Sequence, residues 1–525
     1  MTADRTPSTN PDSDCLPDNL PECHKLIKDL RAEVKRLTEI ANTVALLQQR
    51  VAELEKQLRR RNRKIFGKSS AKMPAAMLTG TGKILYDNFH RELDAERANL
   101  QLVPDAKKHG GGGRNIATTG PVERTVEHKI TNPSALACPC CGTLRQVIGF
   151  DASYQLDVLK TVFELLKHIE YKYACPDCQG QVVSASKPYQ PIDKGYPAPG
   201  LIAHIGAAKF DLHLPLYRQE RIFRAQSIPV SRSSMCRWLK GGADLLEIVV
   251  RRMHELMLAS RVIQSDDTTM PVIKKGLGKT HRGYTWLYRS EDLPYIIYDL
   301  TETHGGEHPE RKLPGFKGIL QTDGASVYNG VISKGATRAG CWSHAFRYFE
   351  DARKEEPERA DYSLAIMKSL FKIEEMTADL SEDERRDIRR RISKPKIDKL
   401  RTWLDEQAAT ILPKSALGDA FTYCRNQWDA LALYVNTGFL SMHNNNSENG
   451  LRPAVLGRNN WLFAGSVDGG RTAAIWMSIV HTCRRLSINP FDYLKDALTR
   501  LPSTPISQID QFLPDRWKAL RESQT

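Results

Sequence analysis

Apolar side chains between residues 24 and 60 follow a seven-residue repeat. Its two registers, broken once at Glu33, hold Leu30, Leu37, Val44, Val51 and Leu58 in one and Leu26, Ile40, Leu47 and Leu54 in the other. Their alternating three- and four-residue spacing forms one seam, which is typical of a coiled coil. A packed amphipathic helix has the same spacing, but this run contains neither Gly nor Pro. We therefore predict a coiled coil with a basic segment over residues 24–70, and hence a homodimer or higher oligomer. The polar residues 1–23 are predicted to be disordered.

A second pattern, of short strand-like apolar runs, begins at residue 261. The predicted strands cover 261–267, 283–289, 295–300, 318–323 and a fifth run that ends at 339–342, with a helix or loop through Glu310 after the third. Three strands, a helix and two more strands is the order of a ribonuclease-H-like core. In that fold the first and fourth strands bring their carboxylates together, and a helix after the fifth strand supplies a third. Asp266 and Asp323 end the first and fourth strands here, and Glu448 lies farther along the chain.

Residues 351–440 separate the fifth strand from Glu448. They are charged, and their apolar positions have helical spacing, as at Leu364, Met367, Leu370 and Phe371. We interpret them as a helical insertion within a catalytic core that covers 259–472. A C-terminal helical element at 473–525 follows. The fold class is thus a multidomain α/β protein.

The residues before the core, 191–258, have the outline of a helix-turn-helix domain. A short helix is predicted from Leu201 to Lys209, and another begins at Pro215 and runs to about Ala225. After a turn, Ser231 is the expected N-cap of a third helix. This helix offers Arg232, Ser233 and Arg237 to a DNA groove. An ordinary helical hairpin fits the pattern equally well.

Two cysteine knuckles lie within residues 131–190. Cys138 and Cys141 form the first outer pair and Cys175 and Cys178 the second, each with two intervening residues, while Cys140 is an extra thiol. Four thiolates at this spacing can close a tetrahedral zinc site, so we predict a zinc ribbon. The ribbon could be purely structural or could also contact DNA.

Composition and charge point to a nucleic-acid partner. The formal net charge is +14, which attracts polyanions, although a basic surface also serves solubility. Lys64 and Lys68 lie in a basic run after the heptads and are candidate phosphate contacts, and residues 71–130 are predicted to be a linker region. No apolar run is long enough to span a bilayer, so we expect a cytoplasmic protein without a membrane partner, in which the 11 Cys are reduced.

The three carboxylates each have a second interpretation. A strand-end Asp often caps a loop, and Glu448 could be a residue favoured by a helix N-terminus. Asp267 could replace Asp266, because neighbours on a strand point to opposite faces. Together, Asp266, Asp323 and Glu448 are typical of a site that holds two hard cations around a phosphodiester.

Several motifs make the chain resemble transposases of the insertion-sequence-66 family, in the DDE class. The matching segments are Ser265 to Val272, Gln321-Thr322-Asp323-Gly324, Cys341-Trp342-Ser343-His344 and Asn444 to Pro453. Together with the heptads and the cysteine knuckles, the resemblance extends over nearly the whole chain. The resemblance implies Asp266, Asp323 and Glu448 as ligands of two Mg²⁺ or Mn²⁺ ions. It also favours Asp266 over Asp267 by motif register. His344 and Trp342 either line the site or pack the fifth strand, and we favour packing.

The resemblance implies a transposase that binds double-stranded DNA at the element's ends, hydrolyses a phosphodiester and joins the 3′-hydroxyl to target DNA. Arg452 and Arg458 are further candidate DNA contacts. The resemblance also suggests a bacterial, nucleoid-associated protein with small accessory proteins from the same element. Asp267, His443 and Asn449 depart from the family, which has Glu, an acidic residue and Arg there. A catalytically inactive DNA-binding regulator and a structure-specific nuclease are the alternatives.

Overall fold

The computed structural model describes residues 80–99, positions 163, 166, 172–173 and 183–184, and residues 189–192, 196–274 and 279–523. The chain forms two compact units, residues 1–98 with 189–525, and residues 99–188. In the second unit, β1 (Lys172–Tyr173) pairs antiparallel with β2 (Val183–Ser184). The predicted coiled coil, Lys64, Lys68 and the four cysteines predicted to bind zinc lie outside the described residues.

The centre of the larger unit is a five-stranded mixed sheet. Its strands, in the order β5-β4-β3-β6-β7, are β5 (Ile296–Thr301), β4 (Thr280–Ser290), β3 (Val262–Ile273), β6 (Ile319–Gln321) and β7 (Thr337–Ala339). The first three are antiparallel, and β3, β6 and β7 are parallel. Strand β3 extends beyond the predicted end at residue 267, because β4 pairs with it as far as Ile273.

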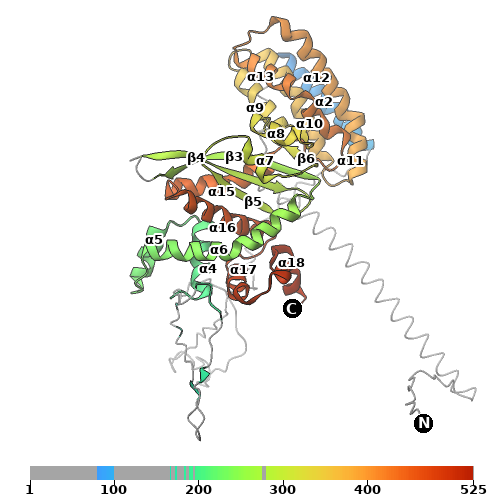
Figure 1. Cartoon of the computed structure of the whole chain (residues 1–525). Helices are drawn as coiled ribbons and strands as arrows, with labels where there is room; N and C mark the ends of the chain where they lie inside the picture. The colour runs from blue at the N-terminus through green and yellow to red at the C-terminus, as the bar shows by residue number, and fades with distance from the viewer. Residues whose placement is uncertain are drawn as a thin grey trace, which may run out of the picture. The chain divides into compact units, whose positions relative to one another are not determined.

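Helices cover both faces of this sheet. On one face lie α15 (Asn445–Trp461) and α16 (Val467–Arg485), as Figure 1 shows. On the other lie α7 (Glu307–Lys312), the 3₁₀ turn η2 (Ser326–Tyr328) and α8 (Asn329–Ser333). Two neighbours on β4 mark the faces. Leu287 packs under Gly450 of α15, whereas the Trp286 ring meets the Tyr328 ring edge-on at 6.1 Å.

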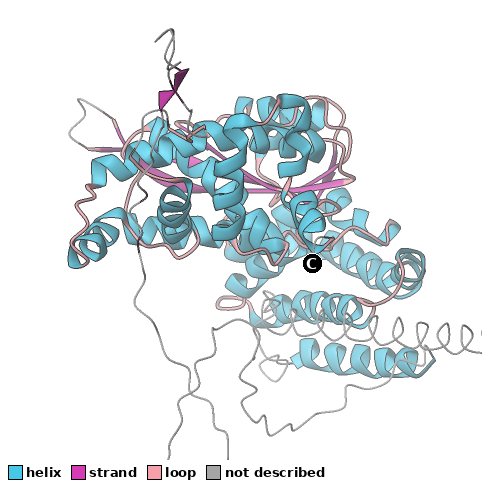
Figure 2. Ribbon diagram, turned by 90° about the horizontal axis from the view of Figure 1, so that it is seen from below, coloured by secondary structure: helices cyan, strands magenta, loops and turns pink. Residues whose placement is uncertain are grey.

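The stretch between β7 and α15 is helical. Its elements are α9 (Trp342–Ala352), α10 (Pro357–Met376), α11 (Glu382–Ile388), a π turn (Arg389–Ser393), α12 (Lys394–Gln407), η4 (Ala408–Thr410), α13 (Ala416–Asn426), α14 (Trp428–Ala432) and η5 (Leu433–Asn436). Figure 2 shows these helices as a separate layer of cyan coils beside the sheet. Arg389 of the π turn donates its Nε–H to Oε1 of Glu374 on α10. This bond joins the π turn to α10 within the helical layer.

Helix α2 (Gly80–Asn99) joins this helical layer, so the predicted linker region 71–130 contains a helix. Phe89 and Leu93 are buried at four-residue spacing, which places them on one helix face. Lys396 of α12 pairs with Glu92 at 3.0 Å, and its Nζ lies 3.8 Å from the Phe89 ring centroid. The helix therefore contacts α12 through a cation–π contact at Phe89 and an ion pair at Glu92.

Helices α4 (Pro199–Phe210), α5 (Leu216–Ala225) and α6 (Arg232–Met257) form the predicted helical region before the sheet. Ser231 caps α6 by accepting the Ser234 N–H, as predicted, but α6 is much longer than its N-terminal motif indicated. Trp476 of α16 fixes this region to the core. Its Nε1 donates to the Leu239 carbonyl at 2.8 Å, and its ring lies where a Cβ on Gly206 would stand.

The C-terminal residues fold as α17 (Pro490–Arg500), η6 (Leu501–Ser503), η7 (Ile506–Phe512) and α18 (Pro514–Glu522). Arg252 of α6 pairs with Asp510 of η7 at 2.7 Å, which fixes this element to the helical region. Among the described helices, none combines the length and apolarity needed to cross a bilayer.

Candidate active site

The strand register separates Asp266 from Asp267. Asp266 lies opposite Leu287 on β4, and Asp267 lies opposite Trp286. Cross-strand partners project from the same face of a sheet. Asp266 therefore faces α15, which carries Glu448. Asp267 faces the other way and binds His304 with 3.0 Å between Oδ1 and Nε2.

Two buried glutamines hold the strands beneath the carboxylates. Gln264 donates Nε2 to Oε1 of Gln321 at 2.8 Å, and accepts the Ser447 N–H from α15 at 3.2 Å. Gln321 donates to the carbonyl of Ser441 at 2.7 Å. Asp266 follows Gln264 by two residues, and Asp323 follows Gln321 by two. The network thus fixes the first part of β3 and the end of β6 relative to the first turn of α15.

Asn444 fixes the beginning of α15 from the loop side. Its Nδ2 donates to the carbonyl of Ser265 at 3.1 Å, and its backbone N–H donates to Sγ of Cys341 at 3.2 Å. Both asparagine and thiol are buried. The run of three Asn before Glu448 therefore begins with a residue that joins β3, α9 and α15. This positions Glu448 one turn into its helix.

The electrostatics bring the three carboxylates into one group. Burial, and then the negative charges of Asp323 and Glu448, raise the pKa of Asp266 to about 8, although the hydrogen bond from the Asp267 N–H lowers it. That N–H donates to Oδ1 of Asp266 at 2.9 Å. Oδ1 of Asp323 accepts the Ala325 N–H at 3.0 Å. Such a group gains from a nearby cation, because like charges oppose ionisation.

Glu448 already has a cationic neighbour within the protein. Nη2 of Arg347 on α9 donates to its Oε1, and Nδ1 of His344 lies 3.7 Å from the same oxygen. Burial, and then the charge of Arg347, lower the pKa of His344. Ligand atoms of Cys341, His344 and Glu448 all lie within 4.8 Å of one another. His344 therefore lies at the site, whereas Trp342 is buried and donates Nε1 to the Leu431 carbonyl.

The donor atoms fit a hard divalent cation. Asp266, Asp323 and Glu448 offer only carboxylate oxygens, which Mg²⁺ prefers, and their mutual repulsion is relieved by positive charge. Cys341 and His344 would instead suit a softer metal beside Glu448. The burial of Cys341 raises its pKa to about 11, so the thiol is protonated at neutral pH and is a poor ligand there.

The remaining predicted DNA contacts lie elsewhere on the unit. Arg232, Ser233 and Arg237 are exposed at the start of α6, and Arg232 pairs with Glu220 at 3.1 Å. Arg452 is exposed on α15. Arg458 instead points back to β3, where its Nη1 donates to Oγ1 of Thr269 at 3.1 Å and to the Thr269 carbonyl. Its guanidinium holds α15 against the strand.

Sequence reasoning missed Gln264, Gln321, Asn444 and Arg347. A signal for the glutamines exists, because Gln264-Ser265-Asp266 and Gln321-Thr322-Asp323 repeat the same order of side chains. A glutamine inside an apolar strand requires a buried partner, and here each is the other's. No local signal marks Arg347, whose contact with Glu448 spans 101 positions.

Comparisons with known proteins agree with this architecture. Residues 194–472, more than half of the chain, match the model described as the transposase IS66 family. Residues 136–179 match the zinc-finger binding domain of transposase IS66, and residues 478–514 match the IS66 C-terminal element.

Two individual proteins are also similar to this chain in sequence. The chain is 31% identical over 410 residues to the uncharacterized protein y4hP of Sinorhizobium fredii, which covers 73% of each chain. It is 28% identical over 531 residues to the uncharacterized protein y4qI of the same organism, covering 96% of this chain and 98% of the relative.

Proposed function

The chain belongs to the IS66 (insertion-sequence-66) transposase family, and from this premise we propose that it cuts and joins DNA with Asp266, Asp323 and Glu448. The observation that supports the proposal is the electrostatic coupling of these carboxylates: burial, and then the charges of Asp323 and Glu448, raise the pKa of Asp266 to about 8. We further assign the sheet, with its order β5-β4-β3-β6-β7, to the ribonuclease-H-like class.

The proposed reaction has two phosphoryl transfers at one site. Hydrolysis at the element's end releases a 3′-hydroxyl, and that hydroxyl then attacks a phosphodiester of the target. Two Mg²⁺ or Mn²⁺ ions held by the carboxylates would supply charge stabilisation for the attacking and leaving oxygens. Gln264 and Gln321 keep the segments that carry Asp266 and Asp323 in place, and Arg347 balances the charge of Glu448.

Double-stranded DNA is the proposed partner, and the start of α6 supports a contact surface. Arg232, Ser233 and Arg237 are exposed there, in agreement with a groove-binding role. Arg452 is exposed on the helix that carries Glu448 and could reach a phosphate near the scissile bond. Lys64 and Lys68 remain proposed DNA contacts on the basis of the sequence. A location at the nucleoid is likewise a proposal.

We propose one Zn²⁺ held by Cys138, Cys141, Cys175 and Cys178. The match of residues 136–179 to the family's zinc-finger model supports this ligand set. Metal analysis of purified protein should find one zinc per chain. A folded protein with much less than one zinc after purification without chelators would contradict the assignment.

The heptads support assembly as a homodimer or higher oligomer, with accessory proteins of the same element as further proposed partners. Charge placed at Leu47 and Leu54 would be buried unpaired in the seam and should weaken pairing. Sedimentation measures the oligomer size of the full chain and of the Leu47→Glu/Leu54→Glu variant. Equal oligomer size for both would contradict a role for the seam.

The test of function is an assay on supercoiled plasmid that carries the element's two ends. A transposase nicks or cuts at the ends and joins them to target DNA in the presence of Mg²⁺. Glu448→Gln should abolish both steps and retain end binding. Cutting without joining would indicate a structure-specific nuclease, and binding without cutting by the wild-type protein would indicate a DNA-binding regulator.

A further inference from the structure

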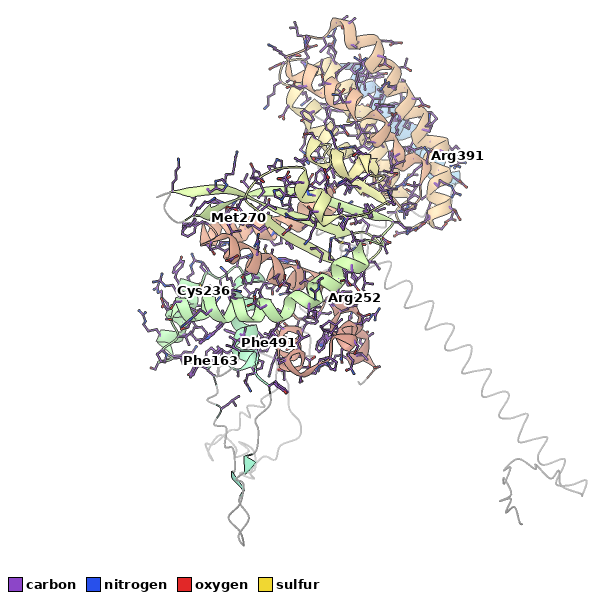
Figure 3. All side chains as sticks on the ribbon, viewed as in Figure 1. Phe163, Cys236, Arg252, Met270, Arg391 and Phe491 are labelled. Atoms are coloured by element: carbon purple, nitrogen blue, oxygen red, sulfur yellow. The ribbon has the colours of Figure 1, made fainter. Side chains whose placement is uncertain are left out.

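A cavity of about 550 Å³ opens between the α4–α6 helices and the core. It lies where the end of α15 meets the beginning of α16, away from the carboxylates. Phe210, Leu239, Met270, Leu300 and Met477 provide apolar walls, and Trp461 and Phe463 are aromatic rings with exposed surface. Figure 3 labels two lining residues, Cys236 on α6 and Met270 on β3. Its volume is within the range of small-molecule pockets, about 300–1,000 Å³.

Three cations line this apolar cavity, against the single carboxylate of Asp468. Lys209 is the most enclosed. Its Nζ lies 4.0 Å from the Trp461 ring centroid, and no carboxylate of the described residues pairs with it. Burial lowers the pKa of Lys209 to about 8. An ammonium group in such a place gains from an incoming anion, because little solvent screens it.

Arg237 and Lys240 form the cationic rim. Arg237 is exposed, and its described contact is Ser234 at 3.4 Å. Lys240 pairs with Asp244 at 3.0 Å on the outer side of α6. Arg237 also belongs to the surface of α6 proposed to contact DNA. The cavity is therefore continuous with a DNA-contacting surface, and its charge complements a polyanion.

From this arrangement we infer that the cavity binds a nucleobase displaced from the DNA, with its phosphate at Lys209 and Arg237. The inference rests on the proposed function, because it takes DNA as the ligand. An apolar, aromatic interior beside cations is the combination that single-stranded nucleic acid recognition requires. A peptide would need backbone partners, whereas this interior is lined mainly by apolar side chains.

The cavity lies at a distance from Glu448 along α15. Glu448 and Trp461 are 461 − 448 = 13 positions apart on this helix. At 1.5 Å per residue this separation is about 20 Å.

The test uses the full chain and a single-stranded 20-nucleotide oligothymidylate with one 5-iodouracil. Irradiation joins this base to an aromatic side chain that touches it, and mass spectrometry of the peptides identifies that residue. We expect the crosslink at Trp461 or Phe463. Crosslinks found only outside the cavity would overturn the inference.

Ala473→Leu tests occupancy, because Ala473 is half-buried on α16 and lines the cavity. The added side chain should fill the space, and the affinity for the oligonucleotide should fall roughly fivefold to a hundredfold, as for the loss of one stacked base. Lys209→Met should also weaken binding while it keeps an apolar stem on Trp461. Ala409→Leu, at an exposed alanine in η4, is the matched control and should bind normally.

Cys236 provides a measurement that needs no variant. It is exposed and lines the cavity, so bound oligonucleotide should slow its alkylation by iodoacetamide several-fold. Unchanged alkylation at saturating oligonucleotide, or unchanged affinity of a folded Ala473→Leu protein, would overturn the inference. So would a crosslink of Lys209 to another segment of this chain that persists when the oligonucleotide is bound. If oligonucleotide crosslinks at the cavity but plasmid ends are never cut, the proposed function fails and the cavity's ligand stands.

Discussion

Gln264 donates its Nε2 proton to Oε1 of Gln321 over 2.8 Å, and this bond joins β3, which carries Asp266, to the end of β6, two residues before Asp323. Both amides are fully buried. Each glutamine also bonds the segment that leads into Glu448, through the Ser447 N–H and the Ser441 carbonyl. The arrangement of the segments that carry the three carboxylates thus depends on two buried, uncharged side chains.

Removal of one glutamine should therefore cost both stability and activity. In Gln321→Leu, the Gln264 amide and the Ser441 carbonyl lose their partner, and the free energy of unfolding should fall by about 1–3 kcal/mol. Plasmid cleavage should fall more than end binding, because the segments that carry Asp266 and Asp323 shift. Urea denaturation and the cleavage assay measure the two effects. A folded Gln321→Leu protein with wild-type cleavage would show that the network does not position the carboxylates.

Asp266 and Asp267 should differ sharply in their effect on cleavage. Asp266 faces α15 and Glu448, so Asp266→Asn removes a proposed metal ligand and should abolish cleavage. Asp267 binds His304 on the opposite face, so Asp267→Asn should retain most of the cleavage activity. The two isosteric variants are matched controls for each other in one plasmid assay. The reverse result would mean that the DNA complex uses the other face of β3.

The sequence and the structure agree most closely where one chain segment decides the outcome. The order of the strands, the cap at Ser231 and the helical character of the residues before Glu448 all follow from local patterns, and the structure has each of them. The opposite faces of Asp266 and Asp267 are defined by the register with β4, which pairs residues about twenty positions apart, whereas the sequence favoured Asp266 only by motif register. Helix α2 was missed because its short apolar face is stabilised by α12, some 300 positions away.

Arg347 should compete with divalent metal for Glu448. Its guanidinium binds Oε1 of Glu448, and a metal ion bound by Glu448 would take that oxygen. The pair is partly exposed, so its loss should strengthen Mn²⁺ binding only modestly, by about two- to fivefold in Arg347→Ala. Calorimetric titration with Mn²⁺ measures the change.

Lys354→Ala controls for the removal of a cation near the same helix. Lys354 follows the end of α9, is 80% exposed, and pairs with Asp351 rather than with Glu448. Its Mn²⁺ affinity should equal that of the wild type. Weaker Mn²⁺ binding by Arg347→Ala would show that the arginine holds Glu448 in its metal-binding orientation instead of competing for it.

His481 should make the fold sensitive to mild acid. His481 is half-buried on α16, its buried Nε2 has no hydrogen-bond partner among the described residues, and desolvation lowers its pKa from 6.5 to about 4. The unfolded chain therefore takes up a proton near pH 6.5, whereas the folded chain does so only near pH 4. Stability from this group is complete above pH 6.5 and is lost as the pH falls toward 4. Between pH 7 and pH 5 the loss is about 2 kcal/mol.

In His481→Gln, which cannot take up this proton, the decrease in unfolding free energy over that range should be smaller by that amount. Urea denaturation of both proteins at pH 7 and pH 5 measures the difference, and equal decreases would show that His481 is not held neutral in the folded chain.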